Sequence, residues 1–221
     1  MRSFTRDRMS NLATRFAIQF QRLRSDVRGV AAVEFAMLLP VMFILFVGTV
    51  EFGQAIAVDR RVTLSASSTA DLIARAPSEG LTVDQVDAEL NILEQLMRPY
   101  DASLLTLRIV SVIANSPQGK LEYKVDWSRD NDGGTPYAHD ATYDTDDSSD
   151  PKHTSKIPQG LLSNLDSVII AEATYNYTPL IFSYFLKGPF QFQKTFFAKP
   201  RNASCVLLKT TFDCRTGVPL S

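Results

Sequence analysis

The chain has 221 residues and a net charge of −1, but the charge is unevenly distributed. The first 28 residues carry seven Arg against two Asp, a net charge of +5, which leaves −6 for the remainder. No P-loop, GxSxG or HExxH signature is present, so neither an enzyme activity nor a cofactor is expected, and membrane topology explains the basic segment without a nucleic-acid partner.

A basic leader over residues 1–29 precedes an apolar stretch over residues 30–50, whose single charged residue is Glu34. At about 1.5 Å per residue this stretch reaches about 30 Å, which is enough for a transmembrane helix in a lipid bilayer. Because basic flanks stay in the cytoplasm, we expect the N-terminus on the cytoplasmic side of the inner membrane and the acidic body on the opposite side. A cleaved secretory signal is the alternative, although its apolar region normally spans only about 7 to 15 residues.

Glu34 is the anomaly in this stretch. A lone carboxylate in lipid costs at least about 2.5 kcal/mol, so it needs either a partner or a shallow position with access to water. It is the fifth residue after Gly29, and cleavage between Gly29 and Val30 would create a new positive amine on the same helix end. In an assembly, the amine of one subunit could pair with Glu34 of its neighbour, which would set the register between subunits.

Two further helices are predicted in the body. Residues 51–76 continue the apolar helix with small side chains on one face, as in a pilin helix or an ordinary juxtamembrane stalk, and end at a break over residues 77–80. A second helix begins after Thr82, which forms a capping-box pattern with Gln85, and its apolar stripe ends before Pro99.

Strand patterns dominate the rest of the chain. Alternating apolar residues predict strands over residues 105–113 and 121–127 around a polar turn, then over 167–177, 190–198 and, as a short final strand, 204–208. An Asp-rich loop over residues 130–160 contains both histidines but lacks EF-hand and zinc spacing, so a solvated loop is favoured over a metal site.

The C-terminal quarter combines aromatic residues with the only two cysteines. Aromatic side chains are dense between residues 177 and 197, which indicates either core packing or an exposed surface near 180–189 that contacts the membrane or another subunit. Cys205 and Cys214 lie in the exported part of the predicted topology, where a disulfide can persist, and would close a loop of about ten residues.

Several of these features occur together in one known family. The segments that carry the resemblance are Arg28-Gly29-Val30-Ala31-Ala32-Val33-Glu34-Phe35-Ala36, Leu39-Pro40, Val50-Glu51-Phe52-Gly53, Trp127-Ser128, the run from Val168 to Leu180, and Lys199-Pro200-Arg201. The first resembles the prepilin-type leader of type IV pilins and pseudopilins, and the whole set is similar to TadE/TadG-like proteins of tight-adherence (Tad) pilus systems. The Asp-rich loop departs from the family pattern, as does Lys199, where Arg is more frequent.

The resemblance implies the fold, the partners and the site residues. The expected fold is α+β, with a long N-terminal transmembrane helix that continues into a pilin-like head over residues 77–221, in which an antiparallel sheet packs on helices. The implied role is a non-enzymatic minor pseudopilin, cut by a prepilin peptidase between Gly29 and Val30, with Glu34 and Phe35 recognised in cutting or assembly. Its partners would be other pilins or pseudopilins and the inner-membrane platform of the Tad machinery. The alternative is an uncleaved single-pass protein whose exported domain binds a ligand such as calcium or a glycan.

Overall fold

A computed structural model describes residues 29–116, 121–143, 157–158, 160–179, 181 and 189–209. The chain divides into two compact units, Met1–Val50 and Glu51–Ser221. In chain order the described elements are α2 (Val30–Ala74), α3 (Val83–Glu94), the 3-10 turns η2 (Gln95–Met97) and η3 (Ala102–Leu104), and the strands β1 (Leu105–Asn115), β2 (Glu122–Asp130), β3 (Ser167–Tyr177) and β4 (Phe190–Ala198). The predicted α+β class is confirmed.

Helix α2 runs for 45 residues and includes Pro40. In the second unit its buried face includes Val58, Val62, Ala66 and Ile73, which recur at intervals of four, four and seven residues and therefore lie on one side of the helix. The buried hydroxyl group of Thr69 is satisfied within the helix, since its Oγ1 donates to the carbonyl oxygen of Ser65 at 2.7 Å.

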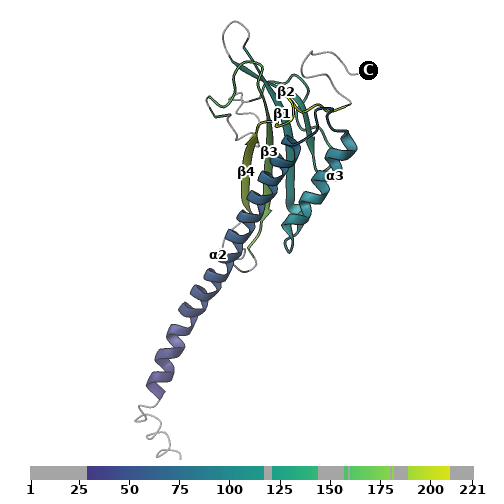
Figure 1. Ribbon diagram of the computed structural model, residues 1–221. Helices are drawn as coiled ribbons and strands as arrows, with labels where there is room; N and C mark the ends of the chain where they lie inside the picture. Colours follow the sequence, from purple (N-terminus) through teal and green to yellow (C-terminus); the bar gives the residue numbers. More distant parts are fainter. Residues whose placement is uncertain are drawn as a thin grey trace, which may run out of the picture. The chain divides into compact units, whose positions relative to one another are not determined.

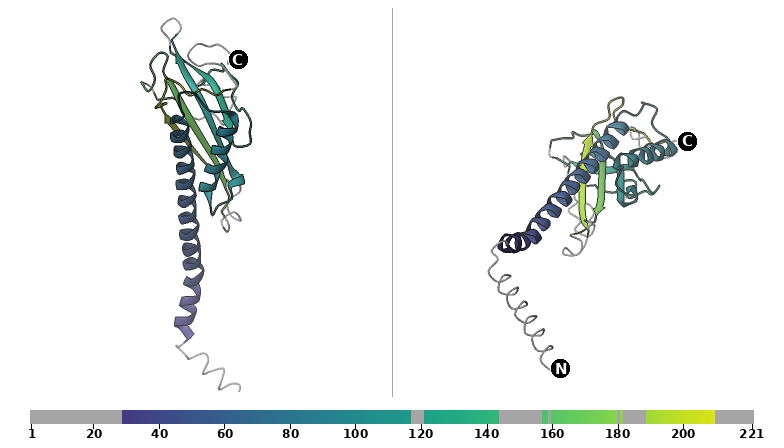
Figure 2. Two further views of the ribbon diagram at one scale, coloured as in Figure 1. Left: turned by 45° about the vertical axis from the view of Figure 1, so that its right-hand side comes forward. Right: turned by 90° about the horizontal axis from the view of Figure 1, so that it is seen from below.

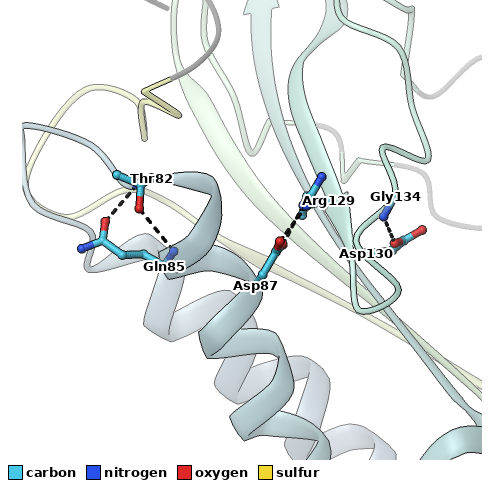
Figure 3. A network of polar contacts seen from close by, with 6 residues as sticks. All are labelled: Thr82, Gln85, Asp87, Arg129, Asp130 and Gly134. Atoms are coloured by element: carbon cyan, nitrogen blue, oxygen red, sulfur yellow. Dashed lines mark hydrogen bonds and ion pairs between the residues drawn. The ribbon is translucent and has the colours of Figure 1, made fainter.

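Helix α3 begins where the capping box predicted it. The Gln85 amide N–H donates to Thr82 Oγ1 at 3.3 Å, and the Thr82 N–H donates to Gln85 Oε1 at 2.9 Å (Figure 3). Two of the four N–H groups that a helix leaves unpaired at its start are thereby satisfied. Val86 and Leu90, one turn apart, are fully buried and turn the helix toward the core.

The four strands form one antiparallel sheet in the order β2-β1-β3-β4. On one face, side chains of β1 and β3 pack in a single core cluster with residues of α2 and α3; Figures 1 and 2 show both helices alongside the strands. A second cluster lies on alternate residues of the same strands, including Val110 and Ile170, and is covered by Tyr143, Ile157 and Leu162. The sheet is therefore buried on both faces, by helices on one and by connecting segments on the other.

Strand β2 contains an irregularity that places a carboxylate in the interior. Ser111 of β1 pairs with Trp127, while the next residue, Val112, pairs with Val125, so Asp126 is the extra residue of a β-bulge. Asp126 is buried, and its carbonyl oxygen contacts His139 Nδ1 at 2.7 Å. The outer edge of β2 is covered by residues 140–143, whose backbone bonds with Val125 and Tyr123 satisfy the edge groups.

One predicted strand is wrong. Residues 204–208 do not form a strand; Leu208 makes a single parallel bridge with Leu81, flanked by backbone hydrogen bonds of 2.9 Å. Val206 and Leu208 are buried there because they cover the helix-bearing side of the core, and Cys205 is also buried, which explains the strand-like pattern. The centre of the predicted turn between β1 and β2, residues 117–120, lies outside the described residues.

Candidate functional site

The predicted processing residues stand at the start of the described chain. Gly29 immediately precedes α2, and Val30 is the first helical residue, with half of its surface exposed. A Cβ atom added at Gly29 would meet nothing within 4 Å. Packing within the described chain therefore does not require glycine at this position, so any requirement for it comes from outside the fold.

Glu34 and Phe35, the predicted recognition residues, lie in the second turn of α2 and are both exposed, Phe35 by 59%. The described part of the chain offers the Glu34 carboxylate no hydrogen bond or ion pair. The helix around them is apolar on all sides, and by length and composition α2 can cross a membrane. A carboxylate in such surroundings is available for a partner supplied by another chain.

The second acidic residue of the N-terminal motif, Glu51, has a different environment. It is buried, and its carboxylate accepts a hydrogen bond from the backbone N–H of Ile181, which follows β3. Burial, assisted by the negative charge of Glu51, raises the pKa of Tyr177 at the end of β3. Glu51 thus ties the first turn of α2 in the second unit to the connection between β3 and β4.

The Trp-Ser-Arg segment of β2 anchors three separate parts of the head. The Trp127 indole Nε1–H donates to the carbonyl oxygen of Val206 at 2.7 Å, and Ser128 Oγ donates to the carbonyl oxygen of Tyr137 at 2.8 Å. Arg129 forms a bidentate pair with Asp87 of α3, with Nε and Nη2 each 2.6 Å from a carboxylate oxygen (Figure 3). These contacts hold α3, the loop after β2 and the C-terminal segment on one strand.

The Asp87–Arg129 pair shifts the pKa of both of its partners. The hydrogen bond from Arg129 lowers the pKa of the Asp87 carboxyl, and the same contact raises the pKa of Arg129. Both side chains are mostly shielded from solvent, so the planar fork geometry of the guanidinium adds orientation as well as charge. Next to it, Asp130 Oδ1 accepts from the Gly134 N–H at 2.5 Å and closes the turn after β2 (Figure 3).

Glu172, in the middle of β3, is a buried carboxylate held by two tyrosines. Tyr143 Oη donates to Oε1 at 2.6 Å and Tyr137 Oη donates to Oε2 at 3.0 Å, while the two rings meet edge to face with centroids 5.7 Å apart. The two hydroxyl donors satisfy carboxylate oxygens that burial removes from water, and Arg108 of β1 is the residue directly opposite Glu172 in the sheet. The motif residue Glu172 therefore has a structural role in holding the loop over the second face.

The Lys-Pro-Arg segment lies at the C-terminal end of α2. Arg201 forms an ion pair with Asp71, and its backbone N–H donates to the carbonyl oxygen of Ala74 at 2.9 Å. The Asn202 side-chain amide donates to the carbonyl oxygens of Arg75 and Ala76. These donors satisfy carbonyl groups that the helix end leaves unpaired, and Lys199 instead pairs with Asp166 at 3.1 Å.

The remaining predicted site residues are only partly described. Cys205 is buried and is not a free thiol, whereas Cys214 lies outside the described residues, so the pairing of the two remains a prediction. His139 is exposed, and His153 and residues 144–156 of the Asp-rich loop also lie outside them. No group of three potential metal ligands occurs within the ranges that the structure describes.

A small pocket of about 240 Å³ opens beside the β-bulge, between β2 and the loop that follows it. It is lined by Asp126, Ser128, Arg129, Tyr137 and His139 together with apolar residues. Sequence reasoning missed this cluster, because a bulge depends on the register between two strands and leaves no periodic signal in either one. It also missed Asp87 and Tyr143 as partners of Arg129 and Glu172, since each contact joins residues that are distant in sequence.

Within the described residues, one helix is long and apolar enough to span a membrane, and the C-terminal half of that helix is built into the core of an α+β head. Residues 29–71 match the family model of TadE-like proteins, so the resemblance is confirmed for the segment that begins at Gly29 and covers nearly all of α2. The match covers the N-terminal part of the described chain and ends within α2. No match is found among curated proteins or among solved structures.

Proposed function

We propose that this protein is a minor pseudopilin-like component of Tad pilus assembly or secretion, anchored in the inner membrane through α2 with its head in the periplasm. The observation that carries the proposal is that the TadE-like match begins at Gly29, the residue after which a prepilin peptidase would cut. The basic residues before it favour a cytoplasmic N-terminus. The protein acts by helix packing and by presenting its head, and it has no catalytic role.

The chemistry of assembly follows from Val30 and Glu34. After cleavage, the Val30 amine carries a positive charge at the start of a helix that exposes only apolar side chains and one carboxylate around it. In lipid, neither charge is stable alone, so pairing the amine of one subunit with Glu34 of the next favours one register over its neighbours. The peptidase and the neighbouring pilin subunits are thus the partners of this segment.

The test of processing is N-terminal sequencing of the full chain extracted from membranes of cells with and without the cognate prepilin peptidase. The wild-type chain should begin at Val30 only when the peptidase is present. Gly29→Val should leave Met1 intact, because the branched side chain blocks close approach of the peptidase while the open space at residue 29 accommodates it in the fold. An intact Met1 in the wild-type chain would favour the uncleaved, ligand-binding alternative.

Glu34→Gln tests assembly separately from processing. The substitution keeps the size of the side chain and removes its charge, so the variant should be inserted in the membrane but should fail to support pilus formation. Glu79→Gln, in the exposed turn before α3, is the matched control and should assemble normally. If Glu34→Gln supports wild-type numbers of pili, the intersubunit role of this carboxylate is wrong.

A further inference from the structure

Glu89, in the middle of α3, is a partly buried carboxylate that the fold leaves unsatisfied. Its Oε2 atom is shielded from water, and no described residue donates a hydrogen bond to it. Val86, one turn earlier, and Leu90, the next residue, are fully buried in the core cluster that α3 shares with α2 and the sheet. An ionised oxygen at the border of such a core costs free energy, because neither water nor a donor compensates its charge, whereas a protonated carboxyl carries no charge.

The neighbouring helix α2 supplies no cation at the level of Glu89. Arg61 Nη1 of α2 donates to the carbonyl oxygen of Leu96 at 3.2 Å, so α3, which follows α2 after a short turn, runs back alongside it (Figures 1 and 2). Moving back along α3 from Leu96 to Glu89, or forward along α2 from Arg61 to Ser68, covers about 10 Å in each case. Glu89 therefore lies level with Ser68, where residues 65–69 of α2 are Ser, Ala and Thr only.

The charged side chains around α3 are engaged elsewhere or exposed. They include Arg61, Asp71 and Arg75 of α2, Asp84 and Asp87 of α3, Arg129 of β2 and Lys209 of the C-terminal segment. Asp87 pairs with Arg129, and Asp71 pairs with Arg75. Arg61 is bound to a backbone carbonyl, and both Asp84 and Lys209 are exposed. Burial alone therefore raises the pKa of the Glu89 carboxyl.

We propose that Glu89 makes the attachment of α3 to the core depend on pH, so that the helix is held more firmly in mildly acidic solution than at neutral pH. At neutral pH the carboxyl is ionised, and its charge opposes the burial of that side of α3. As the pH falls through the raised pKa of the folded state toward the ordinary value of 4.5, the carboxyl takes up a proton and this cost disappears.

The response of Glu89 to pH is opposite to that of Asp87, two residues earlier on the same helix. The pair between Asp87 and Arg129 stabilises the fold above pH 3.8 and is lost only below it. Between pH 3.8 and 4.5, Asp87 is therefore still ionised in the folded state while most of Glu89 is already neutral. The attachment of α3 should be firmest in this window.

The test compares Glu89→Gln with the wild type by urea unfolding of the full chain in detergent at pH 7 and pH 4.5, followed through Trp127 fluorescence. Gln has the size of a protonated Glu and cannot ionise. At pH 7 the variant should unfold at a higher urea concentration than the wild type, and at pH 4.5 the difference between their midpoints should be much smaller. Glu79→Gln, in the exposed turn before α3, is the matched control and should keep the wild-type midpoint at both pH values.

Hydrogen exchange at pH 7 shows whether the effect lies in α3. Backbone amides of α3 that are not adjacent to residue 89 should exchange more slowly in Glu89→Gln than in the wild type. Unchanged exchange in α3 overturns the proposal even if the urea midpoint rises. A midpoint of Glu89→Gln that is equal to or below that of the wild type at pH 7, or a difference of the same size at both pH values, also overturns it.

Glu89→Met is the deciding variant if Glu89→Gln lacks the cooperative unfolding transition of the wild type. Met has a similar length and removes the charge together with the polar group. A midpoint above that of the wild type at pH 7 supports the proposal, and a midpoint equal to it or below it overturns the proposal.

Discussion

At the scale of single residues, Glu172 shows how the head tolerates a buried negative charge. The carboxylate takes hydrogen bonds from Tyr143 and Tyr137, and only the first of these hydroxyls is deeply buried. Removing a buried donor leaves the acceptor unsatisfied, which costs more than the net value of the bond itself.

Tyr143→Phe should therefore lower the free energy of unfolding of the head by about 1–3 kcal/mol. Tyr137→Phe is the matched variant and should cost less, because its hydrogen bond is longer and its ring is partly exposed to water. Urea unfolding of the full chain in detergent, followed through Trp127 fluorescence, measures the loss of free energy of unfolding in each variant. Equal losses for the two variants would contradict the view that burial sets the cost.

The Asp87–Arg129 pair gives the head a predictable response to acid. The pKa of Asp87 in the folded state lies below its ordinary value of 3.8, so the pair stabilises the fold above that pH. The contribution is lost as the pH falls from 3.8 through the lower pKa of the folded state.

Asp87→Asn should reduce the free energy of unfolding by about 1–2 kcal/mol at pH 7, less than for a fully buried charged pair because 30% of the Asp87 side chain is exposed. The difference in free energy of unfolding between this variant and the wild type should be smaller at pH 3 than at pH 7, as measured by urea unfolding at both pH values. Asp132→Asn, in the exposed turn after β2, should show neither effect. A difference that does not depend on pH would mean that the ion pair is not its source.

At the scale of elements, Gly80 makes the turn between α2 and α3 possible. Its φ angle is +81°, and a Cβ atom there would come within 2.6 Å of the Leu207 carbonyl oxygen. The close approach exists because Leu81 donates its backbone N–H to that same carbonyl at 2.9 Å. The glycine thus allows the C-terminal segment to cover the helix-bearing side of the core.

Gly80→Ala should lower the free energy of unfolding by about 3 kcal/mol or more, since the strain of a positive φ adds to the steric clash. Gly160 has the same φ of +81° but open space around it, so Gly160→Ala should cost only about 1–2 kcal/mol. Both variants share the strain of a positive φ, and only Gly80→Ala adds a steric clash, so the difference between their thermal unfolding measures the cost of the clash. Equal costs would show that the bridge to residues 207–208 is dispensable.

Elements with a local signal were predictable, whereas contacts between distant segments were not. The Thr82–Gln85 capping box and the alternating residues of β3 fix a helix start and a strand from neighbouring residues alone. The bulge at Asp126 and the covering of the second sheet face by Tyr143 depend on how strands and loops meet in space. Residues 204–208 have the apolar pattern of a strand because they are buried, yet the backbone there forms only one bridge.

In the candidate site, too, local features were predictable from the sequence, whereas contacts between distant segments were not. The spacing from Gly29 to Glu34 and the apolar length of the helix were visible in the sequence, and the family match falls on this segment. The sequence could not reveal that the motif residues Trp127, Glu172 and Arg201 hold the head together, since each contacts a residue between 29 and 130 positions away.

At the scale of the whole molecule, α2 has two roles along its length. Val58, Val62, Ala66 and Ile73 are fully buried in the core cluster with the sheet, so the head is incomplete without residues 51–74. A fragment over residues 51–221 should therefore unfold cooperatively, whereas one over residues 77–221 should lack a cooperative transition and should aggregate. Circular dichroism during heating measures the cooperativity of unfolding, and size-exclusion chromatography measures aggregation. A 77–221 fragment that is monomeric and unfolds cooperatively would contradict the role of α2.

Arg201 and Asn202, which donate hydrogen bonds to carbonyl groups at the C-terminal end of α2, also limit when the head can fold. These residues contact Asp71, Arg75 and Ala76, roughly 130 positions earlier, and the central strand β1 has its longest pairing with β3. During synthesis from the N-terminus, α2 is made well before β3, β4 and the closing segment. Contacts of such large sequence separation form slowly. The apolar face of α2 in the second unit must therefore remain uncovered until most of the chain has been made, and in that interval it is available to chaperones or to neighbouring helices.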